Sequence, residues 1–371
     1  MHVIALNWRD LANPRAGGAE VHLEEILRWL GHNGWRCTLL TSHFPGGARD
    51  EQADGYRIVR AGGEYTFNLA VPGLYRRVAA ADPPDIVLDD INKIPFLSPL
   101  FVRGVPVLGV IPHLMGRSVF QEVAAPVAAA IYAVELLVKP LYRACHFEVI
   151  SESTRQDLIA RGYAADRITV ALCGIDRATY HVDPTVPKTA APSLLYVGRI
   201  KRYKSVDHLL RALPLVRREI PDATLTVVGD GDGLDALRAL ATELGLGDAV
   251  RFTGFVTSAE KVRLMQSTHV MQNPSIREGW GLTNVEANAC GTVCVAADSP
   301  GLRDSVLDGR TGLLYQYGDI AALARQTVRL LGDAALRARL ERDALAWADG
   351  LTWERCGAET AALMRRVLGR D

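Results

Sequence analysis

Two carboxylates, Glu278 and Glu286, stand eight positions apart in the stretch 277–286, with a glycine-flanked turn between them. Glu278 falls in a predicted loop, and Glu286 lies about one turn into a predicted helix. Because the first amides of a helix have no internal partner, the N–H groups of residues 282–284 are expected to point free and to attract a phosphate. Carboxylates flanking a phosphate site suit a ligand with hydroxyls at both ends, such as a nucleotide sugar.

A second motif is basic and occupies residues 197–204. Arg199 and Lys204 lie on a predicted loop between a strand and a helix. Arginine can bind two phosphate oxygens at once, and lysine adds a point charge, so the pair could neutralise a diphosphate leaving group. The alternative is a solvated basic loop. The chain has 42 Lys and Arg residues together and very few of them are Lys, so a lysine in a motif is informative.

A third motif contains the adjacent glycines Gly17 and Gly18, between the first predicted strand and the first long predicted helix. Two glycines allow close approach of the backbone to a ligand, and at a helix N-terminus that geometry fits a phosphate. A tight loop with a glycine cap is the alternative. The pattern is not GxGxxG, so the dinucleotide fingerprint is missing where it would be expected.

Other strand-end residues are weaker candidates. The run 229–233 reads Gly-Asp-Gly-Asp-Gly and could be a dinucleotide loop or a metal site, but it follows the second strand of its half, which favours a turn. His113 follows the predicted strand 105–111, where site residues collect, although a buried structural histidine is an alternative. Ser151 and the run 174–176 occupy similar positions.

Apolar β-branched runs alternate with helical patterns along the whole chain, which is typical of parallel sheets covered by helices. Strands are expected at 2–7, 35–41, 56–60, 85–89, 105–111, 146–150 and 167–171, and again at 193–198, 223–229, 250–253, 269–272, 293–296 and 312–314. Helices are expected at 17–32, 120–143, 152–162, 204–219, 234–245, 258–267, 282–290, 319–332, 333–349 and 352–368. The sequence therefore predicts an α/β protein with two doubly wound domains and a cleft between them, where ligands bind beyond the carboxyl ends of the strands.

Composition and length agree with two globular domains. The chain has 371 residues, of which 49% are hydrophobic, and a formal net charge of zero, and this size exceeds one ordinary core. We place a first domain at 1–176, a Pro- and Thr-rich linker at 177–192 and a second domain at 193–351. Neither half is basic enough to indicate nucleic-acid binding. Six scattered cysteines without a CxxC pair and a start that runs directly into a strand predict reduced thiols and a cytoplasmic protein.

The stretch from Val123 to Val138 is apolar on nearly every helical face, although Pro126 and Glu135 interrupt it. It falls short of the roughly 18 apolar residues of a membrane span. We expect a helix buried inside the first domain. A hydrophobic acceptor groove, or a peripheral contact of the 120–143 region with the inner face of a membrane, is the alternative.

Taken together, the Gly17–Gly18 loop, the Gly198–Lys204 loop, the glutamate pair and the following Ala289-Cys290-Gly291 resemble glycosyltransferase family 4, a large family of retaining enzymes with the GT-B fold. The resemblance runs nearly end to end. It implies two Rossmann-like domains that face each other across a cleft and enclose the donor. It also implies that the last helix, here 352–371, crosses back to the first domain.

The resemblance also implies roles for individual residues. Arg199 and Lys204 would bind the donor diphosphate, Glu286 the ribose hydroxyls and Glu278 the hydroxyls of the transferred sugar. The remaining donor residues would be the helix start at Gly281, Leu282 and Thr283, the loop at Gly17 and Gly18, and His113 near the sugar. Two positions depart from the family pattern: Ser205 replaces a usual glycine, and Trp280 a commoner Phe or Tyr.

The predicted activity is transfer of a sugar from a nucleotide diphosphate sugar to an acceptor hydroxyl, with retention of the anomeric configuration and without a metal cofactor. In this family the leaving phosphate is thought to help deprotonate the acceptor, so no protein base is named. The acceptor could be a polysaccharide, a lipid-linked glycan or a small molecule. Alternatives are a nucleotide-sugar epimerase or a phosphorylase on the same fold, and a catalytically idle sugar-nucleotide-binding subunit. A dinucleotide oxidoreductase ranks below these.

Overall fold

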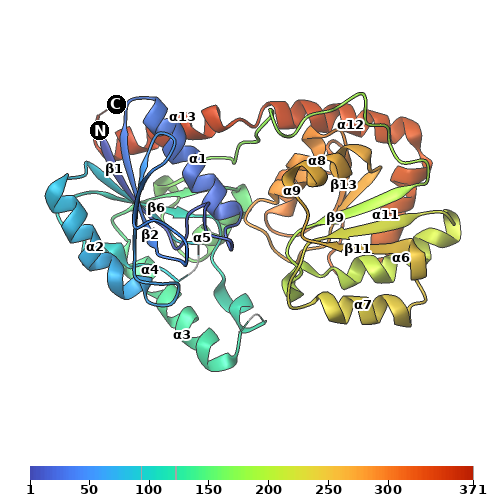
Figure 1. The fold of residues 1–371 in the computed structure, drawn as a ribbon, viewed down its shortest axis with the longest axis horizontal. Helices are drawn as coiled ribbons and strands as arrows, with labels where there is room; N and C mark the ends of the chain where they lie inside the picture. Colours follow the sequence, from blue (N-terminus) through green and yellow to red (C-terminus); the bar gives the residue numbers. More distant parts are fainter. Residues whose placement is uncertain (93, 122, 371) are drawn as a thin grey trace. The chain divides into compact units, whose positions relative to one another are not determined.

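The computed structural model describes residues 1–92, 94–121 and 123–370 of the chain and is drawn as a ribbon in Figure 1. It divides into two compact units. The first comprises Met1–Gly174 together with the C-terminal segment from Trp353, and the second comprises Ile175–Thr352. Residues 177–192, the expected linker, therefore belong to the second unit.

The first unit is built on an eight-stranded sheet with the order β3-β4-β2-β1-β5-β6-β7-β8. All neighbours pair in parallel except β3 with β4. The strands are β1 (His2–Leu6), β2 (Arg36–Ser42), β3 (Asp50–Gln52), β4 (Arg57–Ala61), β5 (Ile86–Asp90), β6 (Val107–Ile111), β7 (His146–Val149) and β8 (Ile168–Val170). The α-helices are α1 (Gly18–His32), α2 (Phe67–Ala81), α3 (Ala125–Leu136), α4 (Val138–Leu141), α5 (Glu152–Ala160) and α13 (Trp353–Val367), with 3-10 turns at Ser98–Leu100, Gly116–Gln121 and Ala165–Arg167.

Both faces of this sheet are covered, because successive side chains of a strand point to opposite faces. On β1, Val3 and Ala5 join a buried cluster with residues of α1 and α13, whereas Ile4 and Leu6 join a second cluster with residues of α2. Figure 1 shows α1 and α13 side by side. Gly357 of α13 lies so close to the Trp29 indole that an added Cβ would stand 2.5 Å from ring atoms. The last helix is thus an integral part of the first unit.

The second unit is built on a six-stranded parallel sheet with the order β11-β10-β9-β12-β13-β14. The strands are β9 (Ser193–Val197), β10 (Thr224–Val228), β11 (Val250–Gly254), β12 (Val270–Asn273), β13 (Val293–Ala297) and β14 (Gly312–Tyr315). The helices are α6 (Asp207–Glu219), α7 (Leu234–Glu243), α8 (Ser258–Ser267), α9 (Leu282–Ala289), α10 (Leu302–Ser305), α11 (Ile320–Gly332) and α12 (Ala334–Asp349), with 3-10 turns at Arg202–Lys204 and Gly247–Ala249.

In this order the chain first adds β10 and β11 on one side of β9 and then adds β12, β13 and β14 on its other side, so the strand order reverses beside β9. The register aligns Leu194 of β9 with Leu225 of β10 and with Val270 of β12. The loops that leave the carboxyl ends of these strands therefore emerge together, and such switch points are where doubly wound sheets bind ligands. The loops are 198–206 after β9, 229–233 after β10 and 274–281 after β12.

Sequence patterns do not reveal β3 or α2. β3 consists of three exposed polar residues without an apolar alternation. α2 contains Pro72 followed by Gly73, both of which are unfavourable inside a helix. The four-residue helix α10 also lies in no expected helix. The rest of the alternation of strands and helices appears in the expected order, with two parallel sheets of the doubly wound type.

The apolar segment near residue 130 differs from its expected form. The predicted helix 120–143 is divided into a 3-10 turn, α3 and α4. Within α3 only Ala128 and Glu135 are buried, and the Glu135 carboxylate accepts the Gly116 amide at 2.9 Å and Arg161 Nη1 at 3.1 Å. The expectation of a buried helix is therefore wrong, because the single acidic residue faces inward while the apolar side chains lie outside.

Candidate functional site

The side chains of Lys204 and Glu278 meet at the carboxyl edge of the second sheet. Lys204 follows β9 and Glu278 follows β12, and Lys204 Nζ donates to Glu278 Oε1 at 2.5 Å. Each side chain is 15% exposed. Burial disfavours the ammonium, but the charge and hydrogen bond of Glu278 together with the nearby Tyr203 and Tyr196 outweigh it, so the pKa of Lys204 is raised above its usual value. A charged lysine is thus held next to solvent at the switch point of the sheet.

The turn that presents Lys204 depends on an unusual backbone conformation at Ser205. Ser205 ends the 3-10 turn with φ of 49° and ψ of 39°, in the left-handed region. Side chains with a Cβ adopt this region at a cost, which explains why a glycine suits the position. Ser205 is buried, and its hydroxyl forms a hydrogen bond with the Tyr317 hydroxyl at 2.9 Å. This hydrogen bond stabilises the strained residue.

The start of α9 requires a glycine for two reasons. Gly281 has φ of 87°, and an added Cβ would lie 2.9 Å from both Leu302 Cδ2 and Ser305 Oγ. The N–H groups of Leu282 and Thr283 have no backbone acceptor among the described residues, as expected for the first residues of a helix. The Asn284 amide, however, donates to Gly281 O at 2.9 Å. The expectation that three amides point free is therefore wrong for Asn284, because the turn at Gly281 brings a carbonyl within reach.

Glu286 lies farther along α9 and has a partner that the motif analysis does not include. Its Oε2 atom is 2.6 Å from Nζ of Lys261, a residue of α8. The same ammonium donates to the Tyr180 hydroxyl at 2.9 Å and lies 5.0 Å from the centre of the Tyr180 ring. Burial and the charge of Glu286 raise the pKa of Tyr180. Because few of the 42 basic residues are lysines, Lys261 could have been noticed in the sequence, but nothing there pairs it with Glu286.

Arg199 is exposed at the start of the loop after β9, and its guanidinium forms no hydrogen bond or ion pair with any residue that the structure describes. The backbone of the loop 229–233 packs against the backbone of the loop that carries Arg199. An added Cβ at Gly229 would lie 1.9 Å from Gly198 O, and one at Gly231 would lie 2.1 Å from Ile200 O. The glycines of this loop thus permit close packing of two backbones. The expected turn is confirmed, and α7 begins at Leu234.

The candidates of the first unit lie at the carboxyl edge of its own sheet. Gly17 precedes α1, and its amide donates to Oε2 of Glu20 at 2.8 Å, while Gly18 is the exposed first residue of the helix. His113 comes two residues after the end of β6 and is half-buried. Ser151 instead caps α5, where its hydroxyl accepts the Thr154 amide at 3.1 Å.

Within the described ranges, no group of three or more His, Cys, Asp or Glu side chains is placed to hold a metal ion. No helix in that part of the chain combines the length and the apolar character that crossing a membrane requires. All six cysteines are free, and five of them are buried.

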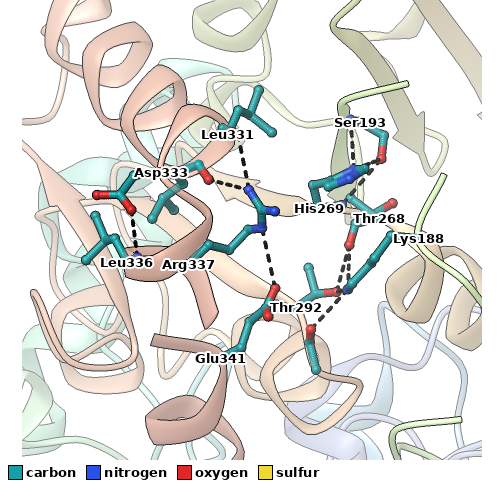
Figure 2. Close-up of polar contacts among 12 residues, drawn as sticks. Lys188, Ser193, Thr268, His269, Thr292, Leu331, Asp333, Leu336, Arg337 and Glu341 are labelled. Carbon is teal, nitrogen blue, oxygen red and sulfur yellow. Dashed lines mark hydrogen bonds and ion pairs between the residues drawn. The ribbon is translucent and has the colours of Figure 1, made fainter. Parts of the chain in front are cut away.

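A second polar cluster of this unit lies at the opposite, amino-terminal edge of the sheet and is drawn in Figure 2. Lys188 Nζ donates to the carbonyl oxygens of Thr268 at 2.7 Å and Gly291 at 3.0 Å, and to the Thr292 hydroxyl at 2.7 Å. Burial lowers the pKa of Lys188 to about 8. Nearby, the amide of Ser193 donates to His269 Nδ1 at 3.2 Å. These contacts attach the segment before β9 to the starts of β12 and β13.

Two Rossmann-like units, with a basic loop and a helix N-terminus at the switch point of the second sheet, are the architecture of the GT-B class. Residues 182–347 match the family of glycosyl transferases group 1, and residues 16–179 match Glycosyltransferase Family 4. The chain belongs to glycosyltransferase family 4. Both Ser205 and Trp280 lie within the first of these matched ranges.

Curated relatives match part of the chain. Glycogen synthase of Mycobacterium tuberculosis (strain ATCC 25618 / H37Rv) is 35% identical over 197 residues, which are 52% of this chain and 47% of that protein. D-inositol 3-phosphate glycosyltransferase of Frankia alni is 37% identical over 234 residues, which are 56% of this chain and 57% of that protein. The chain thus spans about half the length of the curated relatives it matches.

Solved structures match the chain over its whole length. Sucrose-phosphate synthase from Thermosynechococcus elongatus superposes with a TM-score of 0.85 at 22% identity, covering 100% of both chains. Anabaena HepE in complex with UDP and glucose superposes with a TM-score of 0.78 at 19% identity, covering 99% of this chain and 100% of that one. At such identities the likeness establishes the GT-B fold.

Proposed function

We propose that this protein is a retaining glycosyltransferase, which moves a sugar from a nucleoside diphosphate sugar to an acceptor hydroxyl. The observation that carries the proposal is the pairing of Lys204 with Glu278 beside the start of α9. A cation, a carboxylate and free helix amides at a sheet switch point suit a ligand with a diphosphate and a sugar. Family membership supports the same reading.

The chemistry follows from where charge develops. As the bond from the anomeric carbon to the diphosphate oxygen breaks, negative charge grows on the diphosphate and the sugar becomes oxocarbenium-like. Lys204 and the amides of Leu282 and Thr283 are suited to stabilise that negative charge without reorganising, which is usually the largest catalytic contribution. Arg199, which has no competing ion pair in the described structure, is suited to bind a phosphate bidentately.

The carboxylates orient the two sugars in this proposal. Glu278, once its ammonium partner turns to phosphate, accepts hydrogen bonds from the hydroxyls of the transferred sugar. Glu286 accepts those of the ribose. The acceptor hydroxyl forms its bond to the anomeric carbon on the face that the diphosphate leaves and gives its proton to the departing phosphate oxygen. Gly17, Gly18 and His113 keep the donor-binding roles that the family resemblance implies.

The cationic residues replace a metal ion in this mechanism, and we expect turnover to be independent of added divalent cations. The screen that tests the donor class is a thermal-shift measurement with UDP, GDP, dTDP and ADP, followed by their sugars. A ligand that binds only the native state raises its melting temperature. No shift with any nucleotide would contradict the proposal, and an inverted anomer in the product would contradict retention.

The alternatives are separated by incubating the bound donor without an acceptor. An epimerase converts the donor to its epimer, a transferase hydrolyses it only slowly, and an idle binding subunit leaves it intact. Nuclear magnetic resonance of the anomeric proton distinguishes the three results in one experiment.

A peripheral contact with a membrane is the second part of the proposal, and the outward apolar side chains of α3 favour it. Val127 and Leu136 are 52% and 56% exposed. Directly after α3, a cavity of about 410 Å³ is lined by Lys139, Arg143 and Arg167, and its other lining residues are uncharged. An apolar helix beside a cationic cavity is complementary to an anionic lipid surface.

Co-sedimentation with vesicles tests this contact. The protein should pellet with vesicles that contain phosphatidylglycerol and much less with pure phosphatidylcholine. Replacing Val127 and Leu136 by Ser should weaken the binding, and equal binding of this variant would contradict the contact. The exposed Phe255 of the second unit offers the matched control, since Phe255→Ser should leave vesicle binding unchanged.

A further inference from the structure

Lys261 contacts two side chains, and these contacts leave part of its hydrogen-bonding capacity unused. An ammonium has three N–H donors. Among the described residues, one of them is donated to Tyr180 Oη, 2.9 Å away, and Nζ also forms an ion pair with Glu286 Oε2, 2.6 Å away. The Lys261 side chain is 22% exposed and that of Glu286 is 12% exposed. The ammonium therefore keeps donor capacity for a ligand beside the partly exposed Glu286 side chain.

The three side chains come from separate elements, so their meeting is a property of the fold. Glu286 lies on α9, and Lys261 lies in the first half of α8, after the Thr257 hydroxyl that accepts the Glu260 amide at 3.2 Å and starts the helix. Tyr180 precedes the first strand of the sheet, where its amide donates to Asp176 O at 2.8 Å. Tyr180 holds the ammonium through its hydroxyl and its ring, which leaves the lysine few alternative positions.

We propose that Lys261 and Glu286 together read the 2′,3′-diol of the donor ribose, and that Lys261 makes the site select ribonucleotides over 2′-deoxyribonucleotides. The inference rests on the proposed function, because it deepens the role of Glu286. A carboxylate can only accept hydrogen bonds, whereas the adjacent ammonium can only donate them. A hydroxyl both donates and accepts, so two neighbouring hydroxyls can satisfy the pair. A deoxyribose leaves one polar group of the pair without a partner, which is what makes such a site discriminate.

The experiment compares the affinities of matched ligands by calorimetry: UDP with 2′-deoxy-UDP, GDP with 2′-deoxy-GDP and ADP with 2′-deoxy-ADP. Inorganic pyrophosphate serves as a probe of the phosphate site alone. For the base that binds best, the unmodified protein should prefer the ribonucleotide by about tenfold, the size expected for one hydrogen bond to a charged group. Lys261→Met should remove most of this preference and leave the affinity for pyrophosphate unchanged.

Lys201→Met is the matched control, because Lys201 also forms an ion pair at 2.6 Å, with the exposed Asp232 in the neighbouring loop. Its ribose preference should equal that of the unmodified protein. Lys261→Arg should restore part of the preference, since it keeps the charge and the donors. Tyr180→Phe keeps the ring and removes the hydroxyl, so it should reduce the preference less than Lys261→Met does and serves as the test variant if the latter does not fold.

Two results would overturn the inference. A Lys261→Met protein that keeps the full ribose preference would show that Glu286 alone binds the diol, and a Tyr180→Phe protein that keeps it would show that the Tyr180 hydroxyl does not position the lysine for this role. A loss of pyrophosphate affinity equal to the loss of UDP affinity would show that the lysine only maintains the structure. Failure of the proposed function looks different, because the unmodified protein would then bind none of UDP, GDP, ADP and dTDP, whereas binding of dTDP alone would overturn only the ribose inference.

Discussion

Two lysines of the second unit occupy opposite edges of one sheet and have opposite electrostatic surroundings. Lys204, at the carboxyl edge, has a single carboxylate partner, and its pKa is raised. Lys188, at the amino edge, donates to three uncharged oxygens, and burial lowers its pKa to about 8 (Figure 2). A lysine whose donors are all used by backbone and hydroxyl oxygens holds a structure together. A lysine held by one carboxylate can exchange that partner for a ligand.

The largest expected effect comes from the carboxyl edge. Lys204→Met should lower turnover by about 10²-fold or more, the usual loss when one preorganised donor to a developing anion is removed. The melting temperature should change little, because Glu278 can turn to the solvent. Steady-state rates and thermal denaturation measure the two quantities, and Lys201→Met is the control that removes an exposed lysine from the same loop. Near-normal turnover of Lys204→Met would contradict the distinction between a ligand-binding lysine at the carboxyl edge and a structural lysine at the amino edge.

The turn that starts α9 should show the next largest effect. Gly281→Ala places a Cβ 2.9 Å from two neighbouring atoms and imposes a positive φ. We expect a loss of roughly 2–4 kcal/mol of stability from the combined overpacking and backbone strain, with weaker nucleotide binding. Gly245→Ala isolates the backbone part, because Gly245 has φ of 64° but an added Cβ would meet nothing within 4 Å. Equal losses in urea denaturation of both variants would show that packing at α9 contributes nothing.

At the amino edge the expected effect is on stability and depends on pH. Lys188→Met should cost about 1–3 kcal/mol at neutral pH, because three oxygens lose their donor. The pKa of Lys188 is about 8 in the folded chain and near its ordinary value when unfolded, so the unfolded state binds more protons between these values. The stability of the unmodified protein relative to Lys188→Met should therefore rise as the pH increases above 8.

Urea denaturation of both proteins at pH 7, 8.5 and 10 measures this difference, and nucleotide affinity at pH 7 should be the same in both. A stability difference that stays constant with pH would mean that burial does not disfavour the Lys188 ammonium. A loss of nucleotide binding in Lys188→Met would mean that the two edges are not independent.

The same contrast shows what the sequence could and could not predict. Strand-loop-helix order placed Arg199, Lys204, Glu278 and the start of α9 at one sheet edge, because the strands of a parallel sheet have their carboxyl ends at the same edge. Lys188 and Lys261 were not predicted, since their partners are 80 to 104 positions away for Lys188 and 81 away for the Tyr180 contact of Lys261. Such pairs depend on tertiary packing, which no local pattern encodes.

The α3 segment is a different case. Its apolar pattern correctly predicted a helix, but the prediction that this helix is buried was wrong. An apolar helix without a polar face is compatible with burial and with a lipid surface. The outcome is decided by Glu135, whose carboxylate needs Arg161 and the Gly116 amide inside the unit. This need turns the remaining apolar side chains outward.

The smallest expected effect concerns Ser205, which supports Lys204. Ser205→Gly removes the cost of a left-handed residue, about 1 kcal/mol, but it also removes the hydrogen bond with Tyr317, which contributes a similar amount. The two changes nearly cancel, so the melting temperature should stay within a few degrees. Ser205→Ala keeps the strain and loses the hydrogen bond, so it should be about 1 kcal/mol less stable than either. If Ser205→Ala equals the unmodified protein while Ser205→Gly is more stable, strain alone acts at this turn, and the Tyr317 contact does not stabilise the carboxyl edge.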